Sequence, residues 1–216
     1  MEDKYFASHP EGRRDSKEEL QLKNAKIKRM AAIALLMALV VVMQFISGLI
    51  PPVSGFSISL VLIPIVLGAA LYGPSAGALL GATFGMVVYI NCVTGADLGG
   101  AMVFQANPAL CFVVVLGKGI LAGMACGFVY KLLSGLNRYV AMLCAAIVCP
   151  FVNTGVFIAC MMTFFMDVLT AWADGGEIVA YVLSGLVLCN FVPELIINVI
   201  FSPASARIAQ TVSKGM

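Results

Sequence analysis

The sequence has few charged residues for its length and a single histidine. Of its 216 residues, only 11% are Asp, Glu, Lys or Arg, whereas 61% are hydrophobic and the mean hydropathy is +1.01. Soluble globular domains carry about 25% charged residues. The composition therefore excludes an ordinary soluble domain and predicts an all-α integral membrane protein, surrounded by a lipid bilayer and without a nucleic-acid partner.

Motifs for catalysis and metal binding are also missing. The chain has no phosphate-binding loop, no zinc-protease motif, no Ser/His/Asp set and no acidic metal-ligand cluster in its apolar stretches. The seven cysteines lack CxxC or Cys/His spacing and fall in or near apolar stretches, which favours a role in packing. His9, the one histidine, lies in a polar leading stretch. We therefore expect no enzymatic activity, no bound metal and no cofactor in this chain.

Apolar runs interrupted by Pro, Gly and charged residues divide the chain into membrane spans. A helix needs about 20 apolar residues to cross the hydrocarbon core. Six such spans fit within residues 30–206, between a polar tail at 1–29 and a short tail at 207–216, and we expect no cleavable signal peptide. The predicted spans are 30–50, 57–73, 75–92, 109–131, 139–166 and 178–203.

Basic residues predict the orientation of these spans, because Lys and Arg concentrate on the cytoplasmic side of membrane proteins. They occur before the first span, between the fourth and fifth spans and after the last span, which all lie on one side if six spans alternate. The opposite loops, near 51–56, 93–108 and 167–177, contain no Lys or Arg. We therefore expect both termini to be cytoplasmic.

A lysine lies in the middle of the predicted fourth span. Charge at membrane depth is costly and usually serves a ligand or a partner charge. At the rise of an α-helix, Lys118 lies about 13 Å below the outer end of its span. Asn153 and Thr154 lie about 21 Å from the inner end of the fifth span. Asn190 lies about 18 Å from the outer end of the sixth span. Asn91 closes the third span near the outer surface. These residues predict a polar cluster that binds substrate in the outer half.

A polar stripe marks the predicted sixth span. Asn190, Glu194 and Asn198 recur every four residues on one helix face, and Pro193 beside them removes a backbone hydrogen bond. The stripe suits either a ligand site or a polar seam between helices. Glu194 could pair with Lys118, although the helical count puts it about 10 Å deeper. The residues alone leave both a ligand role and an internal ion pair open for Lys118, and they favour the ligand role.

Two outer loops are longer than the inner ones and richer in Gly, Asn and aromatic residues. The first contains Gln105 and Asn107, and the second contains Trp172. Such loops can close over a binding site, which makes these three residues candidate substrate contacts. The alternative is that they are ordinary connectors, with Trp172 anchoring the chain at the membrane interface.

Small residues recur at a spacing of four on two spans. Ala34 and Ala38 lie one turn apart on the first span, and Gly77, Gly81 and Gly85 repeat the spacing on the third. Small-xxx-small patterns of this kind are typical of close helix packing in membranes.

Three local sequences, in this order, resemble the substrate-binding S components of energy-coupling factor (ECF) vitamin transporters. Ala34-xxx-Ala38 matches an AxxxA pattern on the first helix of that family. Residues 62–68 followed by 71–77 (LIPIVLG and LYGPSAG) resemble its second helix and the GPxxG turn into the third, and residues 150–155 (PFVNTG) resemble fifth-helix sequence in some members. The similarity covers residues 30–206.

The resemblance implies a binding subunit in a bacterial or archaeal cell membrane. S components capture a water-soluble vitamin, a related metabolite or a metal ion in an outer pocket. They do not hydrolyse ATP but dock on a membrane coupling protein that carries two cytosolic ATPases, and Ala34 and Ala38 would face that coupling protein. With His9 as the only histidine a metal is disfavoured. A buried Lys with amides suits an acid such as pantothenate, niacin or biotin. The alternatives are a structural subunit of a larger complex and a stand-alone facilitator.

Overall fold

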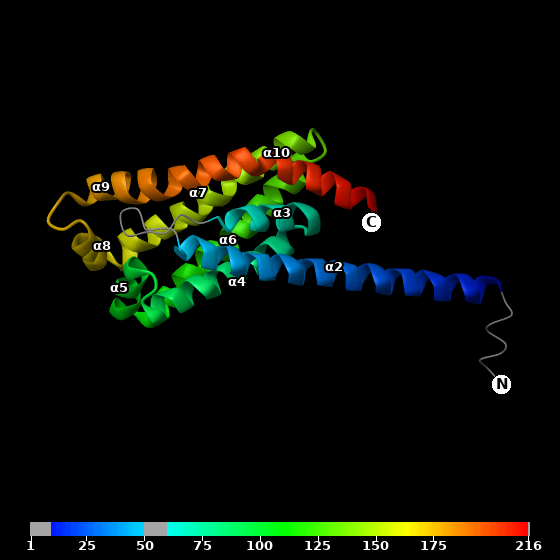
Figure 1. Ribbon diagram of the computed structural model, residues 1–216, viewed down its shortest axis with the longest axis horizontal. Coiled ribbons are helices and arrows are strands. Elements are labelled where there is room, and N and C mark those ends of the chain that lie inside the picture. The colour runs from blue at the N-terminus through cyan, green and yellow to red at the C-terminus, as the bar shows by residue number, and fades with distance from the viewer. Residues whose placement is uncertain (1–9, 50–59, 216) are drawn as a thin grey trace.

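The computed structural model describes residues 10–49 and 60–215, and every regular element within these ranges is helical (Figure 1). The elements are α2 (Pro10–Leu49), α3 (Leu62–Tyr72), α4 (Pro74–Thr94), α5 (Leu98–Ala106), α6 (Pro108–Leu133), α7 (Arg138–Phe164), α8 (Met166–Trp172), α9 (Ile178–Tyr181), the π-helix η1 (Val182–Phe191) and α10 (Val192–Gly215).

Five helical segments are long and apolar enough to cross a membrane: Glu19–Gly48, Pro74–Thr94, Pro108–Leu133, Arg138–Phe164 and Ile178–Val212. They coincide with five of the six predicted spans. The predicted span at 57–73 stays a prediction. Its described part holds α3, which has 11 residues and is about 16 Å long, shorter than a hydrocarbon core of about 30 Å. Positions 57–59 lie outside the described residues.

The long helices run along the long axis of the bundle, with the short helices α5, α8 and α9 gathered at one end (Figure 1). The start of α2 and the end of α10 lie toward the opposite end. The helix α2 is continuous across the predicted boundary between the polar tail and the first span, and its first half projects beyond the bundle. Arg29 ties this helix to α3, because its guanidinium donates a hydrogen bond of 2.9 Å to the Tyr72 carbonyl oxygen.

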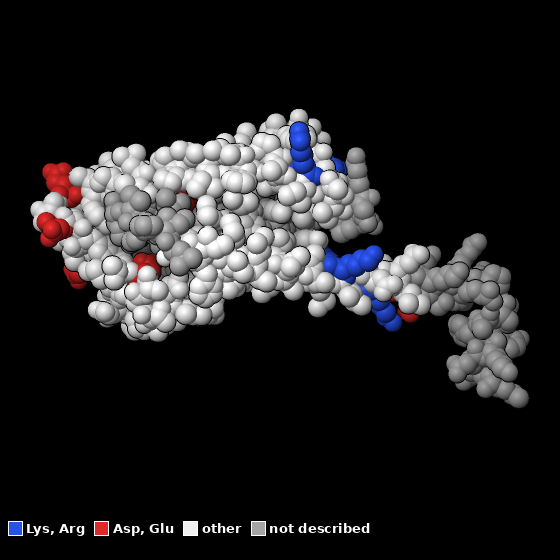
Figure 2. All heavy atoms as spheres, in the orientation of Figure 1, with Lys and Arg blue, Asp and Glu red and all other residues white. Residues whose placement is uncertain are grey.

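Charged side chains separate by sign between the two ends of the bundle. Figure 2 shows Asp and Glu side chains at the end that carries α8 and α9, and Lys and Arg side chains at the opposite end and along the projecting part of α2. The long surface between these ends shows hardly any charge in this view, as expected of helices that face lipid.

Glycines bring α4 and α6 into close contact. A Cβ atom built on Gly81 would lie 2.0 Å from the Gly119 carbonyl oxygen, and one built on Gly123 would lie 2.0 Å from the Gly77 carbonyl oxygen. A Cβ on Gly85 would lie 2.6 Å from the backbone of α6. Only glycine fits at these positions, so the close packing predicted from the glycine spacing of the third span is confirmed.

The helix ends follow from capping residues. Gly73, with φ of 91°, separates α3 from α4, and Pro74 opens α4 at a position where a missing N–H costs nothing. The side chains of Asn107 and Asn137 accept backbone hydrogen bonds at the starts of α6 and α7. Gly95 in the left-handed conformation ends α4.

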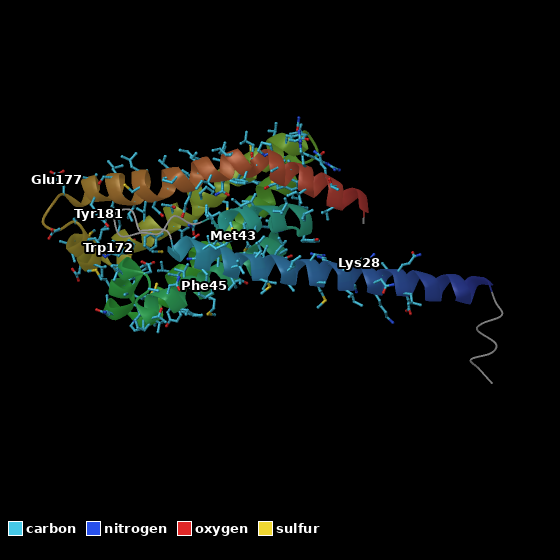
Figure 3. The ribbon with its side chains drawn as sticks, viewed as in Figure 1. Lys28, Met43, Phe45, Trp172, Glu177 and Tyr181 are labelled. Atoms are coloured by element: carbon cyan, nitrogen blue, oxygen red, sulfur yellow. The ribbon has the colours of Figure 1, made fainter. Side chains whose placement is uncertain are left out.

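The short helices at the acidic end pack together around a tryptophan. The indole Nε1 of Trp172 donates to the sulfur of Met102 on α5 at 3.2 Å, and its ring centre lies 6.4 Å from that of Tyr181 on α9. Figure 3 shows Trp172 and Tyr181 together near Glu177, far from Lys28 on the projecting part of α2. The segments 93–108 and 167–177 therefore form a packed cover over this end of the bundle.

Candidate functional site

A cavity of about 250 Å³ lies between the helices, in the half of the bundle that carries α5 and α8. Side chains from α2, α4, α5, α6, α7, η1 and α10 line it. At about 30 Å³ per water molecule, this volume holds about eight waters. It is slightly below the usual range for drug-sized ligands, about 300–1,000 Å³, and suits a small metabolite.

Lys118 enters the cavity from the middle of α6. Its Nζ lies 4.6 Å from the centre of the Phe157 ring and 5.8 Å from that of Phe84, within range for cation–π attraction. The neighbouring Gly119 packs against Gly81 of α4, which fixes α6 and with it the direction of the lysine. The site therefore presents one ammonium group from a rigid wall.

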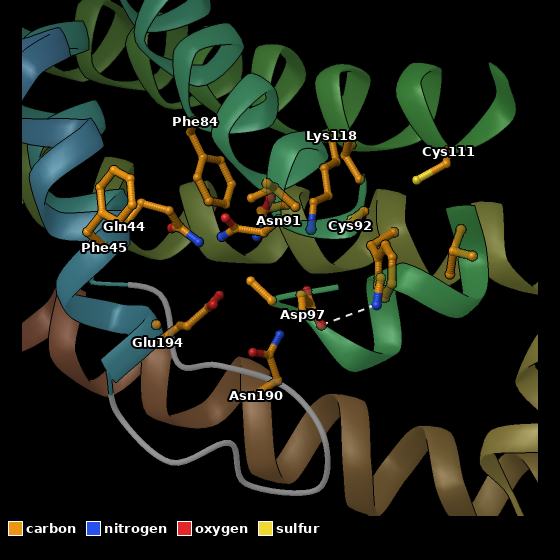
Figure 4. Close-up of a pocket in the computed structure, with 18 residues that line it drawn as sticks. Gln44, Phe45, Phe84, Asn91, Cys92, Asp97, Cys111, Lys118, Asn190 and Glu194 are labelled. Carbon is orange, nitrogen blue, oxygen red and sulfur yellow. Dashed lines mark hydrogen bonds between the residues drawn. The ribbon is translucent and has the colours of Figure 1, made fainter. Parts of the chain in front are cut away.

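Two carboxylates border the same cavity and act electrostatically on the Lys118 ammonium. Asp97 caps α5, since its Oδ1 accepts a hydrogen bond of 3.1 Å from the Gly100 N–H. Glu194, in the first turn of α10, is 2% exposed. Figure 4 shows Glu194 and Asn190 on one side of the cavity, pointing toward Lys118 and Asn91 on the other. Opposite charges thus face one another across the cavity.

Four amide side chains from four elements complete the polar lining. They are Gln44 of α2, Asn91 of α4, Asn153 of α7 and Asn190 of η1. Each amide offers one accepting oxygen and two donor hydrogens. With Lys118 they can hold an anionic group and bind hydroxyl or amide substituents along the rest of a ligand.

The structure brings five of the nine predicted site residues to the cavity: Lys118, Asn91, Asn153, Asn190 and Glu194. Four others do not line it: Thr154, Gln105, Asn107 and Trp172.

Each of those four has another position. Thr154 is 4% exposed and follows Asn153 on α7, so its side chain points about 100° away around the helix. Gln105 is exposed on α5. The Oδ1 of Asn107 accepts from the Leu110 N–H at 3.0 Å and caps α6. Trp172 contacts α5 and α9 and not the cavity.

Lys118 and Glu194 line one cavity, although the helical count put Glu194 about 10 Å deeper. That count assumed an α-helix throughout the last span, whereas Val182–Phe191 form a π-helix. Hydrogen bonds to the fifth residue place more residues in each turn, so the chain descends less per residue. The π-helix therefore accounts for part of the difference and brings Glu194 nearer to the level of Lys118.

Sequence reasoning missed Gln44 and the aromatic residues beside the lysine. Gln44 did carry a signal, because it is an amide within the apolar first span. Asp97 lies in a loop that the sequence marks as a possible cover of the site, but nothing singled out its side chain. Phe84 and Phe157 gave no signal, since aromatic residues are common throughout apolar helices.

The small residues of the first span lie on the outside of the molecule. Ala34 and Ala38 are both exposed on α2, on a different side of the helix from the buried Gln44. They form a shallow strip of helix backbone that another helix can approach closely.

The cysteines and the acidic residues form no metal centre in the part of the chain that the structure describes. All seven cysteines are free thiols, and Cys92 and Cys111 border the cavity. Within residues 10–49 and 60–215, no group of three or more His, Cys, Asp or Glu side chains could hold a metal ion.

The fold and the cavity define a class: a multi-pass membrane protein with an internal cavity lined by polar side chains. The family described as "ECF transporter, substrate-specific component" matches residues 28–205, and the chain belongs to that family. The resemblance predicted from sequence is thereby confirmed. The family is a substrate-binding transporter component and not an enzyme.

One similar protein is a pantothenic acid transporter. The chain is 26% identical over 194 residues to the pantothenic acid transporter PanT of Lactococcus lactis subsp. cremoris (strain MG1363), with 85% of this chain and 94% of that protein covered.

Proposed function

We propose that this chain captures a small water-soluble carboxylic acid for an ATP-driven ECF importer, with pantothenate as the first substrate to test. The observation that carries the proposal is Lys118, a cation inside a cavity lined by amides within the membrane domain. Charge at this depth is costly, and a substrate carboxylate compensates for it. The similarity to a pantothenic acid transporter supports this choice of acid.

The charges around the cavity support binding of the carboxylate at Lys118. Asp97 and Glu194 repel an anion from their own sides of the cavity, whereas Lys118 attracts it. The Phe84 and Phe157 rings beside the ammonium exclude water and strengthen this attraction. When no substrate is bound, Glu194 is the buried acid whose charge stabilises the lysine.

The distribution of charge supports an outward-facing cavity with both termini in the cytoplasm. Basic residues occupy the end from which α2 and α10 emerge, and this supports a cytoplasmic location for that end. The cavity lies nearer the acidic end, beneath α5 and α8. On this basis the protein resides in a bacterial or archaeal plasma membrane and takes its substrate from outside.

Release into the cell requires a partner with ATPase activity, since the family is the substrate-specific component of a transporter. We assign the exposed Ala34 and Ala38 strip to contact with a membrane coupling protein, which would carry two cytosolic ATPases. Small side chains allow a partner helix to approach and slide past α2. A bulky Ala38→Leu substitution should reduce uptake by the assembled transporter while substrate affinity of the isolated subunit stays the same.

The test is substrate binding by purified protein, measured by titration calorimetry and native mass spectrometry with pantothenate, biotin and nicotinate. A charge-assisted hydrogen bond contributes about 1.5–3 kcal/mol, so Lys118→Met should weaken binding of the preferred acid about 10- to 150-fold. Lys131→Met, at the exposed end of the same helix, is the matched control and should bind as the unaltered protein does. Full affinity in Lys118→Met would refute the assignment, and folded protein that binds no acid would favour a structural subunit.

A further inference from the structure

Two buried amides at the cavity hold oxygen atoms without hydrogen-bond partners. Gln44 is 6% exposed and Asn153 is 3% exposed, and both line the cavity. Among the described residues, neither the Gln44 Oε1 nor the Asn153 Oδ1 has a hydrogen-bond partner. A buried acceptor that is left unsatisfied costs free energy, and each such group in a native protein calls for an explanation.

Both oxygens can be turned toward the cavity without any movement of the helices. The last torsion of an amide side chain is broad and roughly two-fold, so a half-turn exchanges the oxygen and the NH₂ group. Figure 4 shows Gln44 reaching from α2 into the cavity, on the side where Glu194 also points inward. Asn153 lines the cavity from α7. After this half-turn, a ligand between these residues meets accepting oxygens on several sides.

We propose that Gln44 and Asn153 are specificity-determining residues that accept hydrogen bonds from hydroxyl or amide N–H groups of the substrate. The inference rests on the proposed function, in which Lys118 holds the substrate carboxylate. The Glu194 carboxyl group lines the same cavity and offers further accepting oxygen to a donor on the ligand. The substrate is therefore a carboxylic acid with at least two further hydrogen-bond donors, and flat acids without such donors are rejected.

Pantothenate fits this description, because it combines a carboxylate with two hydroxyl groups and an amide N–H. Nicotinate has a carboxylate but no further donor. A site whose buried polar groups pair with the ligand rejects an analogue that lacks those partners much more strongly than an apolar pocket does. Discrimination between acids of similar charge is thus the property that Gln44 and Asn153 control.

The experiment measures dissociation constants in detergent or nanodiscs for pantothenate, for its analogue with both hydroxyl groups replaced by hydrogen, and for nicotinate. The unaltered protein should prefer pantothenate to the dideoxy analogue about 10- to 100-fold. Gln44→Met and Asn153→Leu keep the side-chain volume roughly constant and should each reduce this preference several-fold. Gln105→Met changes an exposed amide outside the cavity and should leave the preference unchanged.

Thermal unfolding of the same variants gives a second readout. Because the substitutions remove unsatisfied buried oxygens, Gln44→Met and Asn153→Leu should unfold at the same or a higher temperature. A purely structural role for these amides predicts lower unfolding temperatures and unchanged ligand preference. If a variant does not fold, the comparison of ligands on the unaltered protein still decides.

The outcomes separate this inference from the proposed function. The inference is overturned if the unaltered protein binds pantothenate and its dideoxy analogue equally well, or if it binds nicotinate tightly. Either result still supports the proposed function of an anion-binding subunit. Absence of binding by every acid, or tight binding of a cationic vitamin such as thiamine, overturns the proposed function and the inference with it. Loss of preference in both cavity variants, with the control unchanged, supports both.

Discussion

The glycine contact between α4 and α6 makes a quantitative prediction about the stability of the membrane domain. In Gly81→Ala the new Cβ would lie 2.0 Å from the Gly119 carbonyl oxygen. That atom is backbone and cannot rotate away, so the two helices must separate by about 1.4 Å to restore ordinary contact. Overpacking of this kind costs about 1–3 kcal/mol. For a chain of this size it corresponds to a fall in Tm of about 2–12 °C.

The assay is thermal unfolding in detergent, with matched alanine substitutions at open positions. A Cβ on Gly117, in the same helix α6, or on Gly155, in α7, would meet nothing within 4 Å. Gly117→Ala and Gly155→Ala should therefore stabilise the protein by about 0.4–1 kcal/mol, because alanine favours helix. Gly81→Ala and Gly123→Ala should destabilise it. An equal or higher Tm for Gly81→Ala than for Gly117→Ala would refute the close contact.

Two further predictions concern the cover of the cavity. Asp97→Ala should lower stability by about 0.5–2 kcal/mol through loss of the cap on α5. Asp97→Asn keeps the cap and should unfold at nearly the original temperature. Equal Tm values for the two variants would contradict the capping role. Trp172→Ala should release α5 from α8 and raise the substrate dissociation rate about tenfold in stopped-flow measurements, which corresponds to about 1.4 kcal/mol. An unchanged rate would contradict the role of Trp172 in closing the site.

The long helices could be predicted from sequence because the physical requirement is simple. A membrane span needs about 20 apolar residues, and its ends are marked by capping residues and glycines. The spans expected at 75–92 and 109–131 therefore match Pro74–Thr94 and Pro108–Leu133 closely. The predicted span at 57–73 contains the shorter helix Leu62–Tyr72, because apolar composition alone does not set the length of a helix.

The polar residues of the site could be predicted in part, because amides and charges are costly in an apolar helix and therefore stand out. The direction in which these side chains point could not be predicted. Asn153 and Thr154 are adjacent and equally buried, yet only Asn153 lines the cavity. The rotation of α7 that decides between them is set by packing against α6 and α10, which no local pattern records. The π-helix likewise has no sequence signature, although it changes the rise of the chain that leads to Glu194.

The walls of the cavity differ in how firmly they are packed, and this difference bears on transport. In the most apolar 18-residue stretch of α4, 44% is buried inside the protein. In the corresponding stretch of α2, only 17% is buried. Lys118 lies on α6, which packs closely against α4 through glycines, so it lies on the more tightly packed wall of the cavity. Gln44 stands on α2, which also carries Ala38 on its exposed face. Under the proposed function, a partner that docks on Ala38 would contact the same helix that presents Gln44 to the substrate, and α2 would link docking to substrate binding.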